Sequence, residues 1–231
     1  MNKKYTLISA TITAALCSGL SLVSPAASGA ALTPIEELGQ EIFFDRKLSL
    51  RRNQACASCH VPEAGWVGDD TRINEGGSVY EGSIAGEFGN RKPPSSAYAT
   101  PAPIFFPDGD PEDPLFTGGN FWDGRATGEK LGNPAADQAQ GPFVNRVEQA
   151  LPDSACVVYR VCNASYPVSF EEVWGVGACD IAWPSDIETV CATEGATVAL
   201  SPADRAKSNT AYDAIALSIA AYEDSPEVNA F

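Results

Sequence analysis

The five residues Cys56-Ala-Ser-Cys-His60 constrain this chain more than any other feature of its sequence. A Cys-x-x-Cys-His motif is the attachment site of a c-type haem, in which the thiols add to the porphyrin vinyl groups and the imidazole ligates the iron. The same spacing could form half of a zinc site or a thioredoxin-like redox pair, but zinc needs two further ligands. The motif predicts one covalent haem c, attached at Cys56 and Cys59, with His60 as the proximal iron ligand.

Two residue counts limit the ligand on the other side of the iron. His60 is the only histidine and Met1 the only methionine among the 231 residues. Electron-transfer cytochromes c fill the sixth iron position with Met or His. Because this chain offers neither outside the motif and the initiator, we expect iron that is five-coordinate or holds only a weak ligand such as water. Such an iron can bind and activate a small molecule.

The first thirty residues have the pattern of a secretory signal peptide. Lys3 and Lys4 precede an apolar stretch over residues 7–23, and a run of small residues follows. Polar residues interrupt the apolar stretch, so a transmembrane anchor is the alternative, and Cys17 would be removed with the segment. We predict a signal peptide over residues 1–30, a periplasmic or otherwise exported protein, and no membrane span after processing.

The charge of the chain restricts its partners. The formal net charge is −15, which argues against nucleic acid as a partner. An acidic surface could steer a basic redox protein toward the chain, or it could simply keep an exported protein soluble.

Helix signals lie at both ends of the chain, and a segment rich in Gly, Pro, Asp and Asn separates them. This segment, residues 61–119, is expected to form long loops over the haem. The pattern predicts an all-α, cytochrome c-like haem domain over residues 31–231, with long loops and little or no β structure. Helices are expected from Thr33 to about Phe44, from Asn133, around residues 144–151, from Ser169, and from Ser201 with a buried stripe of Tyr212, Ile215, Ala216, Ile219 and Tyr222.

Four cysteines form a late block that reads as a disulfide-bearing insertion around residues 152–200. In an exported chain such an even set predicts two disulfides, with three possible pairings. We favour pairing of sequence neighbours, Cys156 with Cys162 and Cys179 with Cys191. A zinc site made of all four thiolates is the competing interpretation.

Several motifs in the same order resemble the bacterial di-haem cytochrome c peroxidase family, which includes MauG-like enzymes. They cover nearly all of the chain after the signal peptide and suggest the half of the family that carries the peroxidatic haem. The motifs are Leu38-Gly-Gln-Glu-Ile-Phe-Phe-Asp45, Leu48-Ser-Leu50, Cys56-Ala-Ser-Cys-His60, Phe121-Trp-Asp-Gly-Arg125, and Gln138 ten residues before Glu148 around a Gly-Pro pair.

The resemblance implies roles for three further residues. Glu148 would be the acid/base of peroxide cleavage, Gln138 would orient the peroxide, and Trp122 would relay electrons between two haems. Taken alone, Glu148 reads as a solvated helix carboxylate and Trp122 as a core aromatic.

The chain departs from the family pattern in three respects. It has one Cys-x-x-Cys-His motif where the family has two, so the second haem domain is absent from this chain and we expect a fragment or a single-haem relative. Many members bind calcium through an Asn before a Pro-Thr pair; Lys92 stands at that position, with Asn90 close by, which puts calcium in doubt. Some members also close the resting iron with a distal histidine, which this chain lacks.

The resulting functional prediction is an oxidoreductase, an exported c-type haem peroxidase that reduces hydrogen peroxide. Its electrons would come from an external donor, through a second haem domain and a small cytochrome or copper protein. The alternatives are a non-catalytic electron-transfer cytochrome and MauG-like oxidation of a partner protein.

The motif generates a direct test. Replacing Cys56 and Cys59 together by alanine should abolish covalent haem attachment, because no thiol would remain to form the thioether bonds. The measurement is acid-acetone extraction of protein expressed with haem c maturation. Haem that stays with the extracted double variant would contradict the assignment of the motif.

Overall fold

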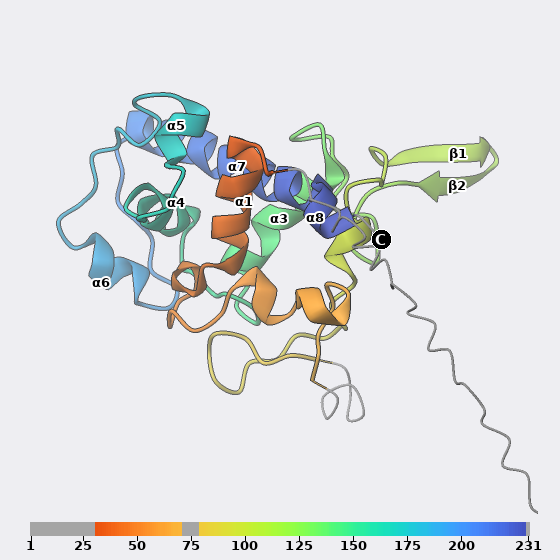
Figure 1. Cartoon of the computed structure of the whole chain (residues 1–231), viewed down its shortest axis with the longest axis horizontal. Helices are drawn as coiled ribbons and strands as arrows, with labels where there is room; N and C mark the ends of the chain where they lie inside the picture. The colour runs from red at the N-terminus through yellow and green to blue at the C-terminus, as the bar shows by residue number, and fades with distance from the viewer. Residues whose placement is uncertain (1–30, 71–78, 230–231) are drawn as a thin grey trace, which may run out of the picture.

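The computed structural model describes residues 31–70 and 79–229, which form a mostly helical fold (Figure 1). The expected all-α class with long loops is confirmed, whereas the expected signal peptide lies outside the described residues. The helices within those ranges are α1 (Pro34–Phe44), α3 (Pro134–Val144), α4 (Ser154–Cys162), α5 (Phe170–Trp174), α6 (Ile187–Cys191), α7 (Pro202–Asp224) and α8 (Pro226–Asn229).

Short 3-10 turns at Arg46–Leu48, Cys56–Ser58, Pro62–Ala64 and Ser96–Tyr98 lie in the long connection that follows α1. None of the helices built from the described residues is long and apolar enough to cross a membrane.

Helix α7 organises the core because α1, α3 and α4 all pack against it (Figure 1). Its predicted stripe from Tyr212 to Tyr222 is buried, which confirms that prediction. The axes of α1 and α7 approach closely at Gly39, where a Cβ atom would lie 1.9 Å from the carbonyl oxygen of Ser218. Glycine is therefore required at the crossing.

The predicted helix starts are confirmed by their capping bonds. The Glu36 carboxylate accepts from the backbone N–H of Thr33 at 2.6 Å. The hydroxyl of Ser201 accepts from the backbone N–H of Asp204 at 3.1 Å. Asn133 and Ser169 cap α3 and α5 in the same way. Each cap satisfies backbone donors that have no partner inside the helix.

The expected helix over residues 144–151 is wrong: α3 ends at Val144 and turns follow it. Asn145 is extended, with φ −75° and ψ 122°. The carbonyl of Glu148 accepts from the backbone N–H of Ser83 at 2.6 Å. Pairing with a distant loop has therefore replaced helical hydrogen bonds, a tertiary effect that local propensity does not contain.

A β-hairpin interrupts the segment that was expected to consist of loops. Strands β1 (Phe106–Asp110) and β2 (Asp113–Thr117) are antiparallel, with Asp110 opposite Asp113, and the hairpin projects from the helical body (Figure 1). Both strands contain proline, which argues against a central strand. A two-stranded ribbon has only edge strands, and these tolerate proline.

The predicted disulfide pairing is wrong. The bonds join Cys156 to Cys191 and Cys162 to Cys179, with Cα atoms 5.5 and 5.6 Å apart. Cys156 and Cys162 lie six residues apart on α4, so they occupy different faces of the helix and cannot meet. Each finds a partner on another segment, and with all four sulfurs paired the alternative zinc site does not form.

The close crossing of α1 and α7 predicts a stability effect. Gly39→Ala should lower the free energy of unfolding by about 1–3 kcal/mol, because the new methyl group overlaps the Ser218 carbonyl. Urea unfolding followed by circular dichroism measures it. Gly141→Ala in α3 is the matched control, since its Cβ would meet nothing closer than 3.4 Å and alanine favours helix. Equal stability of the two variants would contradict the steric explanation.

Candidate haem site

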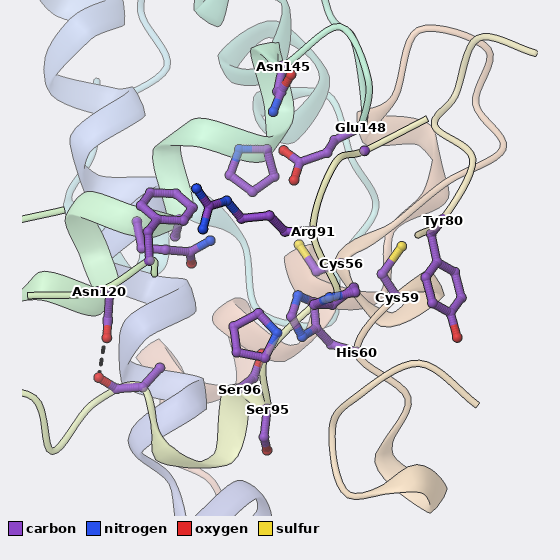
Figure 2. A pocket seen from close by; sticks show the side chains of 18 of the residues that line it. Cys56, Cys59, His60, Tyr80, Arg91, Ser95, Ser96, Asn120, Asn145 and Glu148 are labelled. Atoms are coloured by element: carbon purple, nitrogen blue, oxygen red, sulfur yellow. Dashed lines mark hydrogen bonds between the residues drawn. The ribbon is translucent and has the colours of Figure 1, made fainter. Parts of the chain in front are cut away.

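One cavity of about 690 Å³ brings together every site residue predicted from the sequence. A volume of this size lies within the ~300–1,000 Å³ typical of ligand pockets. Its walls come from the attachment segment, the loops around residues 89–99 and 120–125, α3 with the turn after it, and α7 (Figure 2). The predicted residues among those that line it are Cys56, Cys59, His60, Trp122, Gln138 and Glu148.

The attachment segment presents two free thiols to this cavity. Cys56 and Cys59 are unpaired, whereas the other cysteines of the described residues form disulfides. The turn is held by the His60 N–H, which donates to the Cys56 carbonyl at 3.0 Å, and by the Ala55 N–H, which donates to the Ser58 hydroxyl at 2.9 Å. Burial, followed by the charge of Glu148, raises the pKa of Cys59 to about 12. Both thiols are available for thioether bonds.

The imidazole of His60 is held in one tautomer. Its Nδ1 lies 3.1 Å from the carbonyl oxygen of Trp66. A carbonyl can only accept, so Nδ1 carries the hydrogen and the lone pair remains on Nε2. Burial lowers the pKa of His60, and hydrogen bonds to the carbonyls of Trp66 and Pro94 partly oppose the shift. A neutral ring that carries its hydrogen on Nδ1 can ligate iron through Nε2.

The Trp66 carbonyl is positioned by a tight turn that sequence analysis missed. Gly65 and Trp66 both have positive φ, 73° and 63°. This conformation is unfavourable for a bulky residue and persists only where its surroundings enforce it. An antiparallel bridge between Val61 and Val67 closes the turn, and the indole packs on Phe43 with ring centroids 5.9 Å apart. The Gly65-Trp66 pair in the sequence could have indicated a turn, but it does not reveal that the Trp66 carbonyl contacts His60.

Glu148 and Gln138 reach the cavity from α3 and the turn that follows it. Burial raises the pKa of Glu148, while a hydrogen bond from the Asn145 side chain and the positive charge of Arg125 lower it in part. Figure 2 shows the carboxylate of Glu148 in the cavity wall with Asn145 beside it. Asn145 was not identified from the sequence, because its role depends on the turn that replaced the expected helix. A half-buried carboxyl of this kind can exchange protons with a ligand.

Trp122 lies at the surface and not in the core. Its side chain is 64% exposed, and the indole N–H donates to the Lys92 carbonyl at 3.4 Å. Arg125 fixes the turn by a two-point contact with Asp123 at 2.8 and 2.9 Å, and its guanidinium lies 3.8 Å from the centre of the Phe121 ring. The motif therefore holds an exposed indole on the rim of the cavity.

Further polar groups of the wall have no partner within the described part of the chain. The atoms concerned are Oε1 of Gln54, Oε1 of Gln149 and Oε2 of Glu223, all buried. Buried polar atoms without a partner commonly indicate a missing ligand or water. Together with two free thiols and a neutral imidazole, they fit a haem c. The chemistry of Glu223 could not be read from its sequence position.

Comparison with known proteins shows the family of the chain. A family model described as di-haem cytochrome c peroxidase matches residues 34–229. Methylamine utilization protein MauG of Paracoccus denitrificans (strain Pd 1222) is 34% identical over 168 residues, which are 70% of this chain and 41% of that protein. Cytochrome-c peroxidase IdrP2 of Pseudomonas sp. (strain SCT) is 50% identical over 40 residues, 17% of this chain and 11% of that protein.

Solved structures show the same fold. The di-haem peroxidase BthA of Burkholderia thailandensis E264 superposes with a TM-score of 0.63 at 23% identity, covering 86% of this chain and 40% of that one. Its Y463M variant gives 0.62 at 25% identity, covering 85% and 40%.

The helical scaffold and the cavity with its attachment cysteines and histidine define a c-type haem protein. The chain belongs to the di-haem cytochrome c peroxidase family. It spans about two-fifths of the length of MauG and of the BthA structures.

Proposed function

We propose that residues 31–231 form the peroxide-reacting haem domain of an exported peroxidase. The observation that carries the proposal is the presence of Glu148, a carboxyl whose pKa is raised by burial, in the same cavity as Cys56, Cys59 and His60. The only other candidate for a Met or His ligand is the initiator Met1. A haem held by His60 would therefore receive no second histidine or methionine ligand from residues 31–231, and its iron could bind a substrate.

When bound, haem c supplies the redox-active iron for which His60 is the ligand. Reduction of hydrogen peroxide to two waters consumes two electrons and two protons. Glu148 takes the proton from one peroxide oxygen and returns it to the departing oxygen as a general base and then a general acid. Gln138, on the same wall, donates or accepts a hydrogen bond that orients the peroxide. Asn145 holds the Glu148 carboxyl in place.

Electrons enter in this proposal at Trp122. Its indole is exposed at the rim of the cavity, so a donor can contact it without entering. The immediate donor is a second haem domain, consistent with the fraction of its relatives' length that this chain spans. A small cytochrome or copper protein reduces that domain, and the formal charge of −15 favours a basic surface on the donor.

Substitution of Glu148 tests the proposal. Glu148→Gln should slow the reaction with peroxide by about 10²–10⁴-fold, because the amide cannot exchange the proton. The measurement is stopped-flow absorbance of the ferric holoprotein mixed with peroxide. In the parent the rate should rise with pH as Glu148 deprotonates, at a pH above the ordinary range for glutamate, and this rise should vanish in the variant.

Glu112→Gln is the matched control, since it makes the same chemical change in the exposed turn of the hairpin. It should leave the rate unchanged. Equal peroxide reactivity of Glu148→Gln and the parent would remove Glu148 from the mechanism. A low-spin, six-coordinate ferric spectrum that is indifferent to peroxide would instead favour the electron-transfer alternative.

A further inference from the structure

A second carboxyl, Glu223, faces the cavity from the opposite element, helix α7. Its side chain lines the cavity, and the residue is only 4% exposed. The Ser96 side chain provides a hydrogen bond to the carboxyl, while Oε2 has no partner among the described residues. The proposed peroxide reaction gives Glu223 no role.

Glu223 also lacks a compensating cation. None of the eight ion pairs among the described residues includes Glu223. No basic side chain contributes to the pKa of Glu223. Burial raises the pKa of Glu223 to about 8, and the Ser96 hydrogen bond opposes part of that shift. A buried carboxyl without a cation is ordinarily neutral, because ionisation would place an unpaired charge in a medium of low polarity.

Few titratable groups near Glu223 could exchange a proton together with it. From the attachment segment, Cys56 interacts electrostatically with Glu223, and it would cease to titrate once its sulfur formed a thioether. On α7 and α8, the Tyr222 hydroxyl donates to Glu227 at 2.8 Å, and burial, the first cause, raises the pKa of Tyr222 further above its ordinary value. His60 is the proposed iron ligand.

Across the cavity, the remaining acid is Glu148, and the basic residues in its wall are Arg91, Lys92 and Arg125. Arg125 is paired with Asp123, and its charge acts on Glu148 and not on Glu223. Glu148 is therefore the other carboxyl whose protonation must be separated from that of Glu223 in any experiment.

We propose that Glu223 is the proton site coupled to reduction of the haem in this cavity. Oxidised haem carries one more positive charge than reduced haem, and this charge favours the carboxylate form of a neighbouring acid. Adding one electron to the iron removes that charge, and Glu223 then takes one proton from solvent. Charge within the cavity is thereby conserved. The inference rests on the haem of the proposed function but not on peroxide turnover.

The sign of the pH dependence follows from this coupling. The pKa of Glu223 is higher with reduced than with oxidised haem, so between the two values reduction takes up a proton. Raising the pH then makes reduction less favourable. The midpoint potential should fall by up to ~59 mV per pH unit, the one-electron equivalent of a tenfold change in proton concentration. Outside the pH range between the two pKa values, the midpoint potential should not depend on Glu223.

The test is spectroelectrochemical titration of the haem-loaded chain between pH 5.5 and 10, without peroxide. Glu223→Gln keeps the size of the side chain but cannot ionise, so the slope should disappear. Ser96→Ala removes the hydrogen bond that lowers the Glu223 pKa, so the sloping interval should move to higher pH. Glu148→Gln is the matched control from the same cavity and should retain the slope.

Two results would overturn the inference. One is a slope that persists in Glu223→Gln, which would assign the proton to another group such as a haem propionate. The other is loss of the slope in Glu148→Gln with an unmoved interval in Ser96→Ala. If Glu223→Gln fails to fold, the inference is tested by whether the sloping interval moves to higher pH in Ser96→Ala. Because the titration uses no peroxide, its result tests the role of Glu223 even if the peroxidase proposal fails.

Discussion

The crossing of α1 and α7 determines where the cavity lies and which side chains reach it. Gly39 allows the helices to approach until a methyl group would not fit against the Ser218 carbonyl. Phe43 of α1 and Glu223 of α7 then enter the same cavity wall. The aromatic ring of Phe43 lies 6.4 Å from the ring of His60, so the crossing also supports the proposed iron ligand.

The features that could be predicted from the sequence are those that depend on residues close together in the chain. The helix caps and the buried stripe of α7 are local patterns, and each was found where it was expected. The disulfide pairing and the turn after α3 were not predicted from the sequence, because both depend on which distant segments meet. Trp66 acts through its backbone carbonyl, which residue type does not encode.

The candidate site shows the same division. Cys56, Cys59 and His60 follow from their spacing, while Glu148 gained weight only through family resemblance. Glu223 directly follows the last predicted stripe residue, Tyr222, and by composition it reads as a solvated acid at the end of a helix. Its burial depends on the Ser96–Tyr98 turn and α8, which pack against that end of α7.

Two carboxyls thus face one cavity from different elements and in different surroundings. Glu148 is half-buried and receives a hydrogen bond from Asn145, whereas Glu223 is almost fully buried and has an oxygen without a partner. Pairs of acids whose surroundings separate their pKa values can take separate proton-transfer roles. In our proposals one carboxyl serves the substrate and the other serves the oxidation state of the cofactor.

The distribution of sulfur in the fold has a consequence for how the protein matures. Six cysteines of the described residues reach two chemical fates, because two are free thiols and four form disulfides. Cys156 and Cys191 are fully buried, whereas Cys56 and Cys59 border an open cavity. Thiol exchange requires access to the sulfur. Burial therefore shields the Cys156–Cys191 disulfide from a reductant that reaches the cavity thiols, whereas the partly exposed Cys162–Cys179 disulfide lacks this protection.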